Sequence, residues 1–215
     1  MGQIIQNCLK MIRDTHDALD ILKTNICRNQ SIADACQTIA ELSRNGSVVV
    51  TTGMGKAGHI AQKAASSFSS LGTPSFYIHP GEASHGDVGV IRPRDILLVF
   101  PTSGKTREVV ETVNFARKLN VSKVISVTSH LDSIIRRQSD ITIDMGIIRE
   151  SGYLGIAPTT SIVVMLVIAD MLAVNVAEIN KFGMKDFYIR HHGGYLGKQA
   201  KKKQKKYEQK RNKNQ

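Results

Sequence analysis

Apolar side chains recur at three- and four-residue steps in two segments at the start of the chain, residues 4–26 and 32–43. This spacing puts the apolar side chains on one face of a helix, so it predicts two amphipathic helices. Asn45 and Gly46 follow the second segment directly and predict its end, because both residues favour the turn that terminates a helix.

The pattern then changes to short β-branched runs that alternate with helical stretches. The runs cover residues 47–52, 75–79, 96–100, 123–128 and 141–145. Four of them are apolar along most of their length, as in strands that crossover helices cover on both faces. We therefore predict an α/β fold: a doubly wound, mainly parallel five-stranded sheet that is flanked by helices and preceded by N-terminal helices. An all-helical bundle would leave the five runs unexplained.

The longest apolar run, residues 162–174, contains Asp170 and is shorter than the ~18 residues that indicate a membrane span. It predicts a core helix over residues 159–180 that packs against the sheet or a partner subunit. The N-terminus lacks the charged and then apolar segments of a secretion signal. Three cysteines without a C-x-x-C pair predict neither a disulfide framework nor a zinc site. We expect a soluble cytoplasmic protein that does not contact a membrane.

The length of 215 residues fits one domain. The distribution of charge indicates a separate segment only at the C-terminal end of the chain. The formal net charge is +11. Residues 198–215 hold nine basic residues and one acidic residue, so they carry +8 and the rest of the chain carries +3. We predict one domain over residues 1–197 and a disordered basic tail over residues 198–215. No apolar or aromatic pattern accompanies the lysines, so nucleic acid is not the expected partner.

In open parallel sheets, ligands bind beyond the carboxyl ends of the strands, so the loops after the predicted strands are candidate sites. Residues 53–58, G-M-G-K-A-G, formally match the G-x-G-x-x-G dinucleotide fingerprint. However, the second strand ends at Ile78 and His79 rather than at the acidic residue that would bind a ribose. Lys56 inside this loop favours a phosphorylated or enolate-like ligand. A tight turn with an exposed lysine is the alternative.

The third strand leads through residues 101–106, P-T-S-G-K-T, into a helix. Hydroxyl and free backbone N–H groups at a helix N-terminus attract anions, so we interpret this segment as a phosphate cradle. Helix capping by the hydroxyl residues is the alternative. Residues 79–87 contain two histidines and two carboxylates, but their spacing matches no standard zinc pattern. Substrate contacts by these histidines are therefore favoured over a metal site, and polar groups that are satisfied within the loop are the alternative.

Five segments together resemble one known family. They are G-M-G-K-A-G-H at residues 53–59, H-P-G-E-A-S-H-G-D at 79–87, S-G-K-T-R-E at 103–108, L-G-I-A-P-T-T-S at 154–161 and H-H-G-G-Y-L-G at 191–197. In this order and at this spacing they are similar to the sugar isomerase (SIS) domain of bacterial D-arabinose 5-phosphate isomerases, over about residues 4–197. Longer members continue into a tandem pair of cystathionine-synthase-type regulatory domains, so the resemblance implies a short form without them.

The resemblance implies an SIS fold and an aldose-ketose isomerase that interconverts D-ribulose 5-phosphate and D-arabinose 5-phosphate. This is the first step towards Kdo for lipopolysaccharide or capsule. It also implies a sugar phosphate as the small-molecule partner, a homotetramer in which neighbouring subunits contribute site residues, and no cofactor. We expect no metal.

The resemblance also implies which residues form the site. Its four catalytic positions fall on Lys56, Glu108, Glu150 and His191, and its substrate contacts fall on Gly72, Thr73, His79, His85, Ser103 and Thr106. Moving a proton between C1 and C2 through a cis-enediol needs a base, an acid and a group that stabilises the oxyanion. We assign Lys56 to oxyanion stabilisation and Glu150 and His191 to proton transfer. Glu108 either orients Lys56 or is itself the base.

Two other functions stay open. One is another SIS isomerase such as 6-phospho-3-hexuloisomerase, and the other is a non-catalytic phosphosugar-binding regulator. Such regulators usually carry a helix-turn-helix domain, whereas residues 1–46 predict two long helices without a recognisable DNA-reading helix.

Overall fold

The computed structural model describes residues 1–101, 104–191 and 193–213 of the chain. The elements follow one another as α1 (Gly2–Arg28), α2 (Ser31–Arg44), β1 (Val49–Thr52), α3 (Lys56–Ser70), β2 (Ser75–Ile78), α4 (Pro80–Ala83), the 3-10 helix η1 (Asp87–Val90), β3 (Ile96–Val99), α5 (Arg107–Lys118), β4 (Lys123–Thr128), α6 (Ile134–Gln138), β5 (Ile141–Asp144), α7 (Thr160–Ile179), α8 (Met184–Arg190) and α9 (Gly194–Lys213).

All five predicted strands are present, each within two residues of its expected bounds. They form one sheet in the order β2-β1-β3-β4-β5, and every neighbouring pair is parallel. The predicted α/β fold is therefore confirmed. Because β1 lies between β2 and β3, the chain leaves β1 towards one side of the sheet and leaves β3 towards the other. The loops that follow β1 and β3 therefore diverge at a topological switch point.

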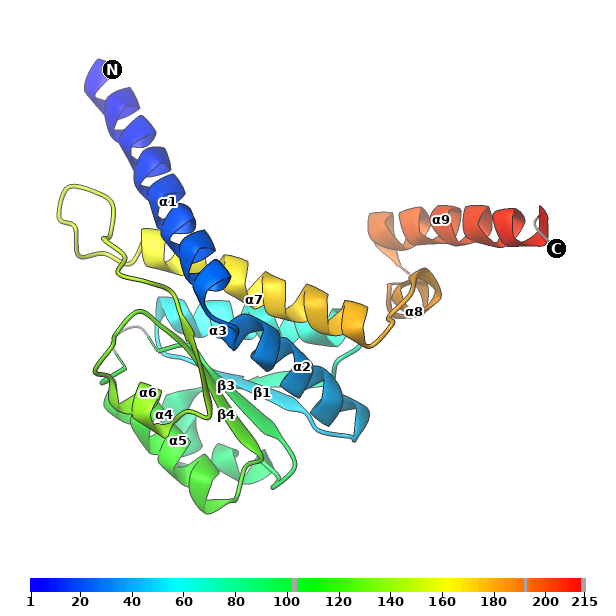
Figure 1. The fold of residues 1–215 in the computed structure, drawn as a ribbon, viewed down its shortest axis with the longest axis horizontal. Helices are drawn as coiled ribbons and strands as arrows, with labels where there is room; N and C mark the ends of the chain where they lie inside the picture. Colours follow the sequence, from blue (N-terminus) through cyan, green and yellow to red (C-terminus); the bar gives the residue numbers. More distant parts are fainter. Residues whose placement is uncertain (102–103, 192, 214–215) are drawn as a thin grey trace.

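Helices cover both faces of the sheet (Figure 1). On one face, α1, α2, α3 and α7 enclose an apolar core that contains Ile39, Phe68 and Leu172. On the other face, α5 and α6 enclose a second core that contains Val109 and Ile135. Side chains alternate across a strand, so the fully buried strands β1 and β3 supply residues to both cores.

The helix α7 is the predicted core helix. By length and composition it could cross a membrane, but a buried helix of a globular core passes the same test. Ile168 and Leu172 are fully buried, and α7 contacts α1, α2 and α3. It is therefore the central helix of one layer of the fold.

The helices α3 and α7 run side by side in the same direction. Lys63 near the middle of α3 pairs with Asp170 near the middle of α7. Gly72, just after α3, lies so close to Phe182, just after α7, that an added Cβ would stand 2.5 Å from the ring. Both helices therefore begin at the edge where the strands end, called here the carboxyl edge, and finish at the opposite, amino edge.

Two segments project from this body (Figure 1). Residues 1–13 of the chain are exposed, whereas Ala18 and Leu22 further along α1 are buried. At the amino edge, α8 and α9 form an arm beyond α7. The backbone of α9 is helical through Lys213, and the disorder expected for residues 198–215 stays a prediction. Lysine and glutamine are good helix formers, so this segment can form a helix although its composition provides little apolar surface to bury.

Candidate active site

The loops after β1 and β3 begin side by side at the switch point. The N–H of Phe100 donates to the carbonyl of Thr52 at 2.9 Å, so the two strands stay paired to their ends. A Cβ on Gly53 would stand 3.0 Å from the carbonyl oxygens of Ala57 and Phe100, which explains why the close approach requires glycine. The two loops lead into α3 and α5, so two helix N-termini begin at neighbouring strands on this edge and favour an anionic ligand.

Three predicted site residues lie at these helix starts. Lys56 is the first residue of α3, Thr106 is the N-cap residue of α5, and Glu108 lies in the first turn of α5. The side chains of Lys56 and Glu108 are exposed. Ser103, the other predicted phosphate contact, lies outside the described residues. The structure therefore brings a cation, a hydroxyl and a carboxylate to one edge of the sheet.

The predicted histidines lie in the loop after the neighbouring strand β2. The N–H of Gly81 donates to Nδ1 of His79 at 3.1 Å, so a neutral His79 carries its proton on Nε2 and can donate there. His85 is exposed between α4 and η1. The hydroxyl of Tyr77 donates to the carbonyl of Gly53 at 3.0 Å and ties β2 to the first glycine loop. Among the described residues, no group of three or more His, Cys, Asp or Glu side chains is arranged to hold a metal ion.

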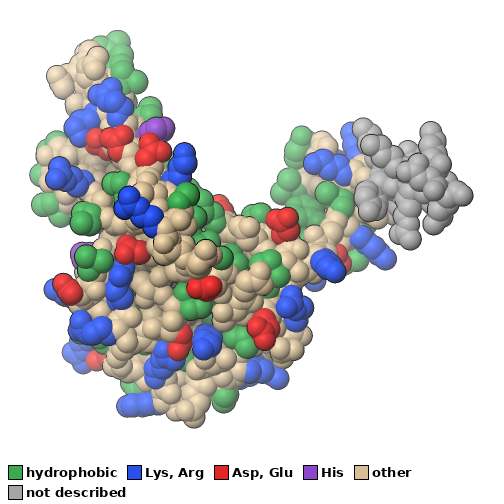
Figure 2. Space-filling view, viewed as in Figure 1, with side chains coloured by type: hydrophobic (Ala, Val, Ile, Leu, Met, Phe, Trp, Pro, Cys, Tyr) green, Lys and Arg blue, Asp and Glu red, His purple; other side chains and the backbone are tan. Residues whose placement is uncertain are grey.

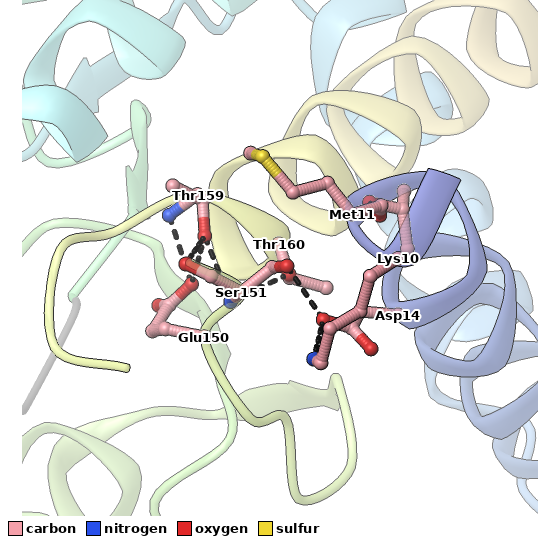
Figure 3. Close-up of polar contacts among 8 residues, drawn as sticks. Lys10, Met11, Asp14, Glu150, Ser151, Thr159 and Thr160 are labelled. Carbon is pink, nitrogen blue, oxygen red and sulfur yellow. Dashed lines mark hydrogen bonds and ion pairs between the residues drawn. The ribbon is translucent and has the colours of Figure 1, made fainter. Parts of the chain in front are cut away.

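Glu150 lies at the same edge, where it closes the N-terminus of α7 (Figure 3). Its Oε2 accepts hydrogen bonds from the Thr159 N–H at 2.8 Å, the Ser161 N–H at 3.2 Å and the Thr159 hydroxyl at 3.3 Å. Its Oε1 accepts a hydrogen bond from the Ser161 hydroxyl. Thr159 and Ser161, at the start of the predicted core helix, are thus the binding partners of this carboxylate.

The charge of Glu150 is stabilised by these bonds. Burial would raise the pKa of the Glu150 carboxyl, but the Ser161 hydroxyl, the Thr159 and Ser161 amides and the Thr159 hydroxyl outweigh burial and hold the pKa below its ordinary value. Glu150 is therefore a carboxylate at neutral pH, able to accept a proton and without one to donate. Among the described residues, Oε1 accepts only from the Ser161 hydroxyl, so it can accept a further hydrogen bond.

His191 lies just after α8, and its tautomer follows from its contacts. The ring stacks on Phe187 with centroids 3.9 Å apart, and Nδ1 lies 3.0 Å from the Phe187 carbonyl oxygen. A carbonyl oxygen only accepts, so Nδ1 carries the proton and Nε2 of the neutral ring has a free lone pair. His191 can therefore act as a base through Nε2.

Three predicted site residues do not lie with the others within one chain. Gly72 and Thr73 precede β2 at the amino edge, where Gly72 packs against Phe182, and Thr73 is buried. The arm that carries His191 begins at the same end, because the Arg190 guanidinium lies 5.2 Å from the centroid of the Phe182 ring. The 20 residues of α7 separate this end from Glu150, a distance of about 30 Å at ~1.5 Å per residue. The predicted set is thus divided between two edges.

Two residues at the Glu150 end were not predicted. The Ser151 hydroxyl donates to Oδ2 of Asp14 at 2.5 Å, across 137 positions of sequence (Figure 3). No periodicity or motif in the sequence relates α1 to the segment after β5. The signal for Ser151 was only its position beside Glu150.

Comparison with known proteins agrees with this architecture. The SIS domain family model matches residues 41–175. The arabinose 5-phosphate isomerase KdsD of Francisella tularensis is 37% identical over 198 residues, which cover 92% of this chain and 60% of that protein. The chain therefore spans less than two thirds of the length of this curated relative.

Two solved structures are similar over most of the chain. A Bacteroides fragilis protein, described as a phosphosugar isomerase involved in capsule formation, is 39% identical with a TM-score of 0.76, and the match covers 86% of this chain and 99% of that one. A protein of Escherichia coli CFT073, solved in complex with arabinose 5-phosphate, is 32% identical with a TM-score of 0.74, and the match covers 86% and 98% of the two chains. The sheet order and these matches lead to one conclusion: this chain belongs to the SIS-domain family.

Proposed function

We propose that this chain is an arabinose 5-phosphate isomerase, which interconverts D-ribulose 5-phosphate and D-arabinose 5-phosphate. The observation that carries the proposal is the switch point, where Lys56 and Glu108 lie at the N-termini of helices that follow neighbouring strands. The relatives of the chain suggest a substrate class for this site, since one is named for this reaction and another was solved with arabinose 5-phosphate. A single phosphate suits two helix N-termini beside a lysine.

The described groups match the chemistry of an aldose-ketose isomerase. A base must remove a proton from C1 or C2, and the oxygen that becomes negative must be stabilised. Glu150 is an ionised acceptor and serves as a base. Lys56 stabilises the oxyanion of the cis-enediol, and His191 accepts and returns a proton on oxygen through Nε2. Glu108 orients Lys56.

The division of the site between two edges favours an oligomer. If a second copy brings its amino edge to the carboxyl edge of the first, His191 of one chain joins Lys56 and Glu150 of another. The surface for such an assembly is the exposed stripe of α1, in which Ile5 and Ile12 are 53% and 66% exposed. This stripe continues the face of α1 that packs on α7, and Figure 2 shows apolar side chains along the projecting part. We propose a homotetramer built from such pairs.

The proposed product places the reaction in the cytoplasm, on the way to Kdo for lipopolysaccharide or capsule. The relative involved in capsule formation supports a capsule role. The decisive experiment incubates the purified chain with ribulose 5-phosphate and identifies the product by ¹³C NMR. Appearance of arabinose 5-phosphate, and its loss in Lys56→Ala, supports the proposal. A preference for a hexulose 6-phosphate would identify a 6-phospho-3-hexuloisomerase, and binding of sugar phosphates without turnover would identify a regulator.

A further inference from the structure

The segment that carries Glu150 is attached to α1 by the hydrogen bond between Ser151 and Asp14. From this geometry we propose that Asp14 and Ser151 are positioning residues that hold the Glu150 carboxylate in place for proton transfer. The role assumed for Glu150 rests on the proposed function, whereas its position in the fold does not.

Ser151 is bonded on two sides. It is buried, with 3% of its surface exposed. Its hydroxyl donates to Asp14 at 2.5 Å, while its backbone N–H approaches the hydroxyls of Thr159 and Thr160 at 3.0 and 3.2 Å. Thr159 also bonds to the Glu150 carboxylate. The residue next to Glu150 is therefore fixed between α1 and the first turn of α7 (Figure 3).

Asp14 is well suited to hold this bond. Lys10, one turn earlier on α1, donates to Asp14 Oδ2 at 2.6 Å. This hydrogen bond and the one from Ser151 hold the pKa of the Asp14 carboxyl below its ordinary value, so Asp14 is an ionised acceptor. The next turn of α1 is anchored, because Ala18 is buried in the core beside α7. Asp14 therefore holds Ser151 at a fixed position relative to the packed part of α1.

The rest of the segment has few comparable anchors. Ile147, Tyr153 and Ile156 are all at least 75% exposed. A cavity of about 380 Å³ lies between the segment and α1, lined in part by Lys10, Asp14 and Glu150. Without the bond to Asp14, the segment has room to shift. Even a displacement of about 1 Å can reduce the rate of a positioned reaction ~100-fold.

The test combines kinetics with a matched control. Ser151→Ala and Asp14→Ala are each expected to lower kcat about ten- to hundredfold with little change in KM. The kcat of the double variant should fall no further than that of either single variant, because both substitutions remove the same hydrogen bond. Asp14→Asn should recover most of the activity, since its amide oxygen also accepts from Ser151. Asp17→Asn, one turn along α1 and lining the same cavity, should keep the wild-type kcat.

A second measurement does not depend on activity. ¹³C NMR of the carboxyl groups, with the Glu150 signal assigned through Glu150→Gln, follows the titration of Glu150. Ser151→Ala keeps the charged groups that line the cavity with Glu150, namely Lys10, Asp14 and Asp17 on α1 and Arg149 on its own segment, although Asp14 loses one hydrogen bond. Looser bonds from Thr159 and Ser161 would raise the pKa of Glu150 in this variant.

The inference is wrong if Ser151→Ala leaves the pKa of Glu150 unchanged. It is also wrong if the wild-type enzyme is active and the kcat of Ser151→Ala stays within about twofold of the wild-type value. If the wild-type chain isomerises none of the sugar phosphates, the proposed function fails, and the titration alone decides whether Ser151 holds Glu150.

Discussion

The Ser161 hydroxyl donates a hydrogen bond to the Glu150 carboxylate and thereby joins the segment after β5 to the first turn of α7. The carboxylate thus has two tasks, since it satisfies the free N–H groups of a buried helix start and it supplies the proposed base. These two tasks can be separated experimentally.

The first prediction separates proton transfer from helix capping. Glu150→Gln keeps an amide oxygen that can accept from Thr159 and Ser161, but it cannot accept the substrate proton. We expect kcat to fall about 10²- to 10⁴-fold, the usual contribution of a general base. Circular dichroism should show the wild-type fold, while the melting temperature falls modestly because the ionised carboxylate stabilises the fold. Near-wild-type turnover would remove Glu150 from the mechanism.

The second prediction concerns pH. Because the pKa of folded Glu150 lies below the ordinary value of 4.5, its ionised form stabilises the fold above that pH, and this contribution is lost as the pH falls through the folded-state pKa. Ser161→Ala removes one donor and raises this pKa. The free energy of unfolding in urea should therefore differ more between wild type and Ser161→Ala at about pH 7 than at about pH 3. An equal difference at both values would assign the effect to packing.

The third prediction tests a site shared between chains. Lys56→Ala and His191→Ala should each be inactive, but co-refolded equal mixtures should recover about one quarter of wild-type activity, because that share of sites receives both intact residues from different chains. A mixture of Lys56→Ala with Glu150→Gln is the control, since both residues lie at the carboxyl edge of one chain. Absence of recovery in the first mixture would place His191 in the same chain's site.

The fourth prediction concerns the exposed stripe of α1. Ile5→Glu combined with Ile12→Glu puts two charges into the proposed contact between copies, so sedimentation velocity should show a smaller assembly and turnover should fall with it. Asn7→Glu, on the opposite face of the same helix, is the matched control. Unchanged assembly in the double variant would exclude this stripe as the contact.

The fifth prediction tests the close packing of the first glycine loop. A Cβ on Gly58 would stand 2.6 Å from the carbonyl oxygen of Gly53. Gly58→Ala should therefore lower the free energy of unfolding by about 1–3 kcal/mol, the usual cost of overpacking. Gly89→Ala is the control, because nothing lies within 4 Å of its added Cβ. Equal stability of the two variants would show that the loop can relax.

The local pattern predicted much of the fold. Residues 123–128 and the core helix were placed almost to the residue, because a run of β-branched side chains or a long apolar helix is a property of neighbouring positions. Composition also predicts disorder for residues 198–215, and this stays a prediction, while the backbone of α9 is helical through Lys213. Composition reports how much apolar surface can be buried, whereas helix propensity acts on each residue whether or not it is buried.

The sequence by itself determined the residue types of the candidate site and the loops that carry them. Lys56 and Glu150 follow strands that can be recognised from the apolar and β-branched residues of the strands themselves. Only the tertiary structure decided their neighbours. It showed that Glu150 caps α7, that Ser151 reaches Asp14 across 137 positions, and that the 20 residues of α7 keep His191 away from Glu150 within one chain. Such relationships depend on how helices pack on a sheet, and packing joins residues that no local periodicity relates.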